Sequence, residues 1–148
     1  MRAPHPPALF VYGTLQFPPV LEALLGRVPP LSPGTLDDHA VVGLVERTYP
    51  GLVTAPGDAA RGWVCEDLGD AEWLVIDSWE DDDYELVTVS VTVRGREPVC
   101  CGTYRLARSE AGEGSWSAAR FATTELASFA AASAQWRRSL PPAATDAR

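Results

Sequence analysis

The stretch LVTVSVTVRGREPVCCGTYRL, residues 86–106, decides the fold expected for this chain. In its first half, valine alternates with threonine or serine, so the valines share one face of a strand and the hydroxyls share the other. Arg94-Gly95 supplies a turn, and residues 99–106 return as the partner strand. The stretch therefore predicts an antiparallel β-hairpin with one buried face.

The segments on either side of this hairpin add further strands and connections. Residues 8–12 are an apolar, partly aromatic run that ends at Gly13, which predicts a buried strand. Between residues 29 and 61, Pro and Gly recur every few positions, so short strands and turns are expected there. Residues 61–67 are another strand candidate, and residues 109–115 form a polar Gly/Ser connection.

Three helices are expected beside these strands. Residues 18–25 begin with two prolines, which suit a first helical turn, and Gly26 ends this helix. Asp70 is expected to cap a helix that runs to about Trp79. The last helix is expected over roughly 124–140. Its apolar stripe consists of Leu126, Phe129, Ala130, Ser133, Trp136 and Leu140.

The number and order of these elements predict the fold class. Strands outnumber helices and are joined mostly by hairpin-length loops, so we expect an α+β fold with a small mixed, mostly antiparallel β-barrel and a few flanking helices. A chain of 148 residues suits a single domain, placed here at residues 8–140. Its core would span 8–106 and a helical extension about 116–140, with flexible tails at 1–7 and 141–148.

Composition excludes several classes of function. The net charge of −8 argues against nucleic-acid binding, which needs basic patches. No apolar run is long enough to cross a membrane, and the first residues lack the apolar stretch of a secretion signal. A cytoplasmic protein is therefore expected. The three cysteines show neither a disulfide framework nor the spacing of a zinc site, so no metal is expected.

The missing residue types narrow the chemistry further. The chain has twelve arginines and no lysine. An enzyme that forms a Schiff base through lysine, or a P-loop that binds phosphate through lysine, is therefore excluded. A serine triad would rest on His39 alone, without a nucleophile elbow. A pair between His39 and Cys65, Cys100 or Cys101 stays open. Acid–base chemistry would otherwise depend on carboxylates.

One carboxylate stands out from the acidic segment. Ten of the twenty acidic residues lie between Glu66 and Glu85, where there is no basic residue. Trp73, Ile76 and Glu80 are spaced by three and four, so Glu80 would project from the apolar face of its helix. Desolvation and neighbouring negative charges would raise the pKa of Glu80 toward that of a general base. The alternative is a helix that frays before Glu80 and an acidic run that is fully solvated.

A second candidate feature follows the first strand. Val11-Tyr12-Gly13-Thr14-Leu15 leads from a strand end into a helix, and such a junction leaves backbone N–H groups free to bind an anion. The segment lacks the glycine pattern of a dinucleotide site. By itself this signal is weak, because strand–turn–helix junctions are common.

Five motifs in order resemble the γ-glutamylcyclotransferase-like family, which includes AIG2-like and γ-glutamylamine cyclotransferase-like proteins. The resemblance spans roughly residues 8–106, with order and spacing preserved. The motifs are Val11-Tyr12-Gly13-Thr14-Leu15, Tyr49-Pro50-Gly51-Leu52, Arg61-Gly62-Trp63-Val64, Leu74-Val75-Ile76-Asp77-Ser78-Trp79-Glu80 with Tyr84, and Gly102-Thr103-Tyr104-Arg105-Leu106.

This resemblance implies a small barrel with one pocket and an enzyme that cyclises a γ-glutamyl amine or peptide to pyroglutamate (5-oxoproline), releasing an amine or amino acid. Glu80 would be the general base and then the acid. The backbone of residues 12–15 would bind the glutamyl carboxylate, and no cofactor would be needed. The substrate-binding residues implied are Tyr12, Gly13, Thr14 and Leu15, with Tyr49, Tyr84 and Tyr104 as weaker candidates.

The chain also departs from the family pattern. Many relatives carry Gly directly after the catalytic Glu, where this chain has Asp81, and Arg shortly after the Tyr, where Tyr84 is followed by Glu85. Two alternatives therefore remain beside the lead hypothesis. One is a biosynthetic cyclotransferase that removes a γ-glutamyl protecting group, and the other is a ligand-binding or regulatory domain without turnover.

Overall fold

The computed structural model describes residues 5–44, 47–80, 83–108 and 112–140, and among them it contains six strands and four α-helices. The strands are β1 (Ala8–Val11), β2 (Leu31–Leu44), β3 (Gly51–Glu66), β4 (Tyr84–Val91), β5 (Val99–Leu106) and β6 (Gly112–Ser115). The helices are α1 (Pro18–Leu25), α2 (Asp70–Trp79), α3 (Ala118–Thr124) and α4 (Leu126–Ser139), with a 3₁₀ turn, η1, at Thr14–Gln16.

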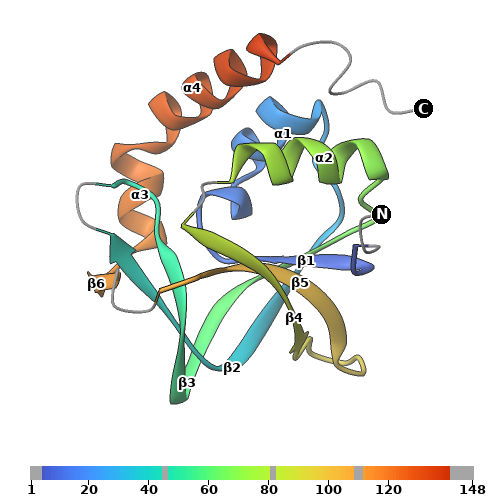
Figure 1. The fold of residues 1–148 in the computed structure, drawn as a ribbon, viewed down its shortest axis with the longest axis vertical. Coiled ribbons are helices and arrows are strands. Elements are labelled where there is room, and N and C mark those ends of the chain that lie inside the picture. Colours follow the sequence, from blue (N-terminus) through green and yellow to red (C-terminus); the bar gives the residue numbers. More distant parts are fainter. Residues whose placement is uncertain (1–4, 45–46, 81–82, 109–111, 141–148) are drawn as a thin grey trace.

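The strands form one curved sheet in the order β4-β5-β1-β3-β2-β6, with the helices gathered on one side of it (Figure 1). Of the strand pairs that the described residues form, β1–β5 is parallel and the others are antiparallel, so the prediction of a mostly antiparallel α+β fold is confirmed. The barrel prediction is wrong in one respect, because the sheet is not closed. Between β2 and the residue that follows β4, the described residues form one isolated bridge, in which the backbones of Thr35 and Thr92 exchange hydrogen bonds of 3.0 and 2.9 Å.

The β4–β5 hairpin matches its prediction closely. Its register pairs Val87 with Thr103 and Val91 with Val99, and residues 94–95 form the turn. Val91 and Val93 are buried while Thr88 is exposed, as the alternating pattern requires. A strict period of two is therefore enough to orient this strand.

The region between residues 29 and 61 differs from its prediction. Two long strands, β2 and β3, replace the expected short ones, and a register shift between Asp37 and His39 absorbs the irregularity. Pro33 pairs with Trp63 of β3, and the bridge on the other side of β2 begins two residues later, at Thr35, so the missing N–H of Pro33 does not interrupt a second ladder. Residues 112–115, expected as a loop, pair with the far end of β2 as β6.

The helices confirm the predictions for α1 and α4 and correct the N-cap of α2. Gly26 ends α1 in the left-handed conformation, at φ +78°. Gly69, rather than Asp70, is the N-cap of α2, because the Glu72 carboxylate accepts the Gly69 N–H at 2.9 Å. The last helix, expected over roughly 124–140, is α4, and a further helix that was not expected, α3, precedes it and meets it at Glu125.

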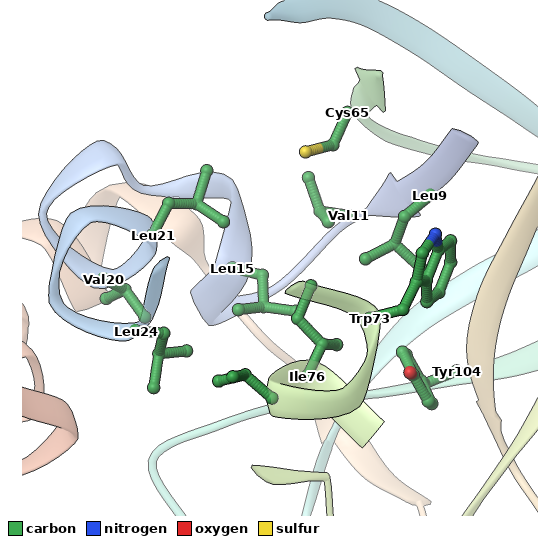
Figure 2. Close-up of a cluster of buried hydrophobic side chains, with 11 residues drawn as sticks. Leu9, Val11, Leu15, Val20, Leu21, Leu24, Cys65, Trp73, Ile76 and Tyr104 are labelled. Carbon is green, nitrogen blue, oxygen red and sulfur yellow. The ribbon is translucent and has the colours of Figure 1, made fainter. Parts of the chain in front are cut away.

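The helical side of the sheet carries the larger apolar cluster. Figure 2 shows β1, α1 and α2 contributing buried side chains to it, among them Leu9, Leu21 and Ile76. Helix α4 adds Phe129 and Trp136 to its margin. His5, expected in a flexible tail, stacks on Trp73 of α2 with ring centroids 4.3 Å apart. The packing of α2 against β1 in this cluster brings the C-terminal end of β1, at Val11, close to the C-terminal end of α2, at Trp79.

Candidate functional site

A cavity of about 330 Å³ lies where β1, the end of α2 and α4 meet. Its volume is at the small end of the range for ligand pockets, roughly 300–1,000 Å³. The eight residues that the family resemblance implies for catalysis or substrate binding all line it: Tyr12, Gly13, Thr14, Leu15, Tyr49, Glu80, Tyr84 and Tyr104. Residues from four separate stretches of the chain are thus brought to one place.

The loop after β1 forms one wall of the cavity. Residues 12–15 are buried, and the turn is closed by a bond from the Gln16 backbone N–H to the Gly13 carbonyl at 3.1 Å. The Gln16 side chain also donates to the Tyr12 carbonyl at 2.7 Å. A Cβ at Gly13 would lie 2.8 Å from Cγ of Pro50, so the close approach of these two loops requires glycine.

Glu80 reaches the cavity from the end of α2. Its N–H bonds to the Ile76 carbonyl at 3.0 Å, but its backbone is already extended, at φ −72° and ψ 145°. Glu80 is therefore the C-cap and not a member of the helical stripe, which corrects the spacing argument used for it. The side chain is half-buried, whereas Asp83 and Glu85 are exposed, and Asp81 lies outside the described residues.

Hydrogen bonds lead from the cavity to the surface of α2. The Tyr12 hydroxyl donates to the Tyr104 carbonyl at 2.6 Å, and the Tyr104 hydroxyl donates to Asp77. Nε2 of His5 lies 2.8 Å from the other Asp77 oxygen. Burial raises the pKa of the Tyr12 phenol well above its usual value, and Tyr84 and Glu80 raise it further. Tyr12 is therefore a neutral hydrogen-bonding group beside Glu80.

Tyr49 and Tyr84 line the side of the cavity near Pro50. The Tyr84 hydroxyl donates to the Pro50 carbonyl, which ties β4 to the loop before β3. The two phenol rings have centroids 6.5 Å apart. Because Pro50 also packs on Gly13, this contact couples the Tyr84 side of the cavity to the loop of residues 12–15.

Sequence reasoning missed one wall of the cavity. Trp79 lines it from the last residue of α2, and α4 lines it with Phe129, Ala132, Ser133 and Trp136. The apolar stripe predicted for the last helix included three of these residues, but a stripe indicates only that a face packs against something. Whether these side chains reach the cavity depends on where α4 packs against the rest of the protein, which the sequence pattern does not specify.

The structure does not favour the alternative of a catalytic pair between His39 and one of the cysteines. None of the three cysteines is among the described residues that line the cavity. The buried His39 ring has Nδ1 2.9 Å from the Asp37 carbonyl and Nε2 3.5 Å from Arg105. Burial raises the pKa of the Cys65 thiol, and that of Cys101, to about 12. Such thiols are protonated at neutral pH and are weak nucleophiles.

This placement predicts how the cysteines react. In the native protein at pH 8, iodoacetamide should modify Cys100, which is exposed, and leave the buried Cys65 and Cys101 unmodified. Mass spectrometry of the intact protein should show one adduct, and three adducts after labelling in denaturant. Rapid native alkylation of Cys65 or Cys101 would contradict the packing around them.

The described residues offer neither a metal site nor a helix that could span a membrane. They contain no group of three or more His, Cys, Asp or Glu side chains arranged to hold a metal ion. Their helices are all too short or too polar to traverse a bilayer.

Comparison with known proteins finds one matching family. The profile described as Gamma-glutamyl cyclotransferase, AIG2-like matches residues 9–119. The curated AIG2-like protein D of Arabidopsis thaliana is 36% identical over 84 residues, which cover 57% of this chain and 55% of that protein. The chain thus spans about half the length of the curated relatives that it matches.

Solved structures share the fold. A solution structure of an Arabidopsis thaliana protein is 26% identical, covers 94% of this chain and 88% of its own, and has a TM-score of 0.68. A structure named Gamma-glutamyl cyclotransferase covers 72% of this chain and 68% of its own, at 18% identity and a TM-score of 0.55. At this identity the second likeness concerns the fold alone.

Proposed function

The chain belongs to the γ-glutamyl cyclotransferase, AIG2-like family, and on that premise we propose that it cyclises a γ-glutamyl amine or peptide to pyroglutamate. The observation that carries the proposal is one cavity shared by Glu80 and the loop of residues 12–15. A carboxylate at one wall faces a junction whose backbone N–H groups suit an anionic group of the substrate.

In the proposed reaction, Glu80 accepts a proton from the α-ammonium of the γ-glutamyl group. The neutral nitrogen then attacks the γ-carbonyl carbon and forms the five-membered ring through a tetrahedral intermediate. As the original amide C–N bond breaks, the protonated Glu80 gives its proton to the departing nitrogen. The restored carboxylate takes the surplus proton of the ring nitrogen and passes it to the released amine, which leaves as an ammonium ion. The products are pyroglutamate and a free amine, and no water, oxidant or metal enters the balance.

The cavity favours this intramolecular step by positioning. The N–H groups of residues 13–15 would hold the glutamyl carboxylate, which leaves the α-amine and the γ-carbonyl directed toward Glu80. Holding two reacting groups of one molecule in contact removes much of the entropic part of the barrier. The Tyr12 phenol, neutral beside Glu80, helps to fix the wall through its bond to the Tyr104 carbonyl.

The proposal is tested by incubating the purified protein with a panel of γ-glutamyl amides and dipeptides and measuring pyroglutamate by mass spectrometry. Enzyme-dependent release from at least one substrate is expected, in a one-to-one ratio with the free amine. No release from any member of the panel would overturn the proposal. Saturable binding of γ-glutamyl compounds without turnover would instead support the ligand-binding or regulatory alternative.

A further inference from the structure

The loop of residues 47–50, which leads into β3, lies against the loop of residues 12–15. Tyr49 and Pro50 line the cavity, and Pro50 is buried. The Pro50 ring is so close to Gly13 that a Cβ there would lie 2.8 Å from Cγ of the proline. A shift of residues 47–50 would therefore move the Tyr49 ring and disturb the loop of residues 12–15 at the same time.

Contacts from the sheet fix the end of the loop that joins β3. The Tyr84 hydroxyl, at the start of β4, donates to the Pro50 carbonyl. Gly51, the first residue of β3, packs on Leu106 so closely that a Cβ would lie 2.5 Å from Cγ of the leucine. The position of residues 50–51 is thus set by side chains of β4 and β5.

Trp116 holds the same loop from a different direction. This residue lies between β6 and α3, and its indole Nε1–H donates to the Thr48 carbonyl at 2.8 Å. Trp116 is not among the described residues that line the cavity. Because the bond is made to a main-chain carbonyl, it positions the backbone next to Tyr49. Trp116 therefore acts on the lining of the cavity without contacting a ligand inside it.

The ring of Trp116 is also connected to the helical wall of the cavity. Its centroid lies 5.6 Å from that of Phe121, a buried residue of α3. Phe121 in turn meets Phe129 of α4 edge-on, with centroids 5.4 Å apart and an interplanar angle of 73°. Phe129 lines the cavity and packs on Trp79, which lines it as well. This series of rings joins the loop of residues 47–50 to α4.

We propose that Trp116 is a positioning residue for the substrate, which keeps residues 47–50 and α4 in one arrangement and so sets the separation of Tyr49 and Phe129. This inference rests on the proposed function for the identity of the ligand. It adds a residue that the family resemblance did not single out. Without its contacts the loop would populate further positions, and apparent affinity falls with the fraction of molecules in the binding-competent arrangement.

Trp116→Phe keeps an aromatic ring beside Phe121 and removes the N–H that Thr48 accepts. KM for a γ-glutamyl substrate should rise about three- to tenfold, while kcat stays within about twofold of the wild type. The value of kcat is preserved because a saturating substrate selects the competent arrangement. Trp116→Ala also removes the ring contacts, so its KM should rise further, by about tenfold or slightly more. Steady-state kinetics on a substrate that the wild type accepts measures both variants.

Ser117→Ala is the matched control. The Ser117 hydroxyl is the N-cap of α3 and accepts the Arg120 N–H at 3.1 Å, so its loss weakens the same segment and leaves the bond to Thr48 in place. KM should match that of the wild type. A merely structural role of Trp116 would lower the folded fraction, and with it the apparent kcat, without changing KM. An equal rise of KM in Ser117→Ala would also overturn the inference.

A binding measurement separates this inference from the proposed function. In the Glu80→Gln background, calorimetry with a γ-glutamyl amide should show Kd weakened about three- to tenfold when Trp116→Phe is added. This measurement needs no turnover. Unchanged KM and Kd in Trp116→Phe would overturn the role of Trp116 and leave the cyclotransferase proposal intact. Absence of pyroglutamate release by the wild type, with Kd weakened as expected, would overturn the cyclotransferase proposal and retain the role of Trp116 in ligand binding.

Discussion

Glu80→Gln should lower kcat for pyroglutamate release by about a hundredfold to ten-thousandfold, the usual loss when a positioned base is removed. Glutamine is nearly isosteric with glutamate, so folding and ligand binding should survive, but its amide does not accept the ammonium proton. The loss should appear in kcat more than in KM, because the proton moves in the chemical step. Steady-state kinetics on any accepted γ-glutamyl substrate measures this.

Asp77→Asn is the comparison for this variant. Asp77 accepts the Tyr104 hydroxyl and faces His5, so it shapes the helix end beside Glu80. Asparagine retains an acceptor for Tyr104, and the expected loss is within about tenfold. Both variants should be compared at matched stability. Undiminished release by Glu80→Gln would show that the base is another group, whereas a larger loss in Asp77→Asn would make Asp77 the better candidate.

Gly13→Ala should lower kcat/KM by about a hundredfold, because misplacing a substrate-binding loop by about 1 Å can cost that much. The added methyl group would lie 2.8 and 2.9 Å from two carbons of the rigid Pro50 ring, so one of the loops must shift. Thermal unfolding should also show a loss of about 1–3 kcal/mol from overpacking. Kinetics on the folded variant separates the two effects.

Gly69→Ala is the matched control. Gly69 caps α2 away from the cavity, and a Cβ there would meet only Oε1 of Glu72, at 3.8 Å. Its activity should stay near that of the wild type. If Gly13→Ala is equally active, the loop of residues 12–15 does not position the substrate as proposed.

Local sequence patterns were sufficient for several elements of this protein. The alternation of valine with hydroxyl residues predicted the β4–β5 hairpin, and Gly26 predicted the end of α1. These features depend on residues close together in the chain, whose side-chain period or backbone freedom already selects one conformation. The order of the family motifs likewise singled out Glu80 and the loop of residues 12–15 before their positions were known.

Other features were decided only by the tertiary structure. Whether the sheet closes depends on how far β2 and β4 share backbone hydrogen bonds, and in the described residues one isolated bridge, between Thr35 and Thr92, joins them. Glu80 reaches the cavity as the C-cap of α2, and not through the helical spacing that suggested it. The apolar stripe of α4 indicated burial, but only its docking on α1 makes Phe129 and Trp136 a wall of the cavity. Such contacts join residues far apart in the chain, and because their free energy arises from packing, local patterns do not specify them.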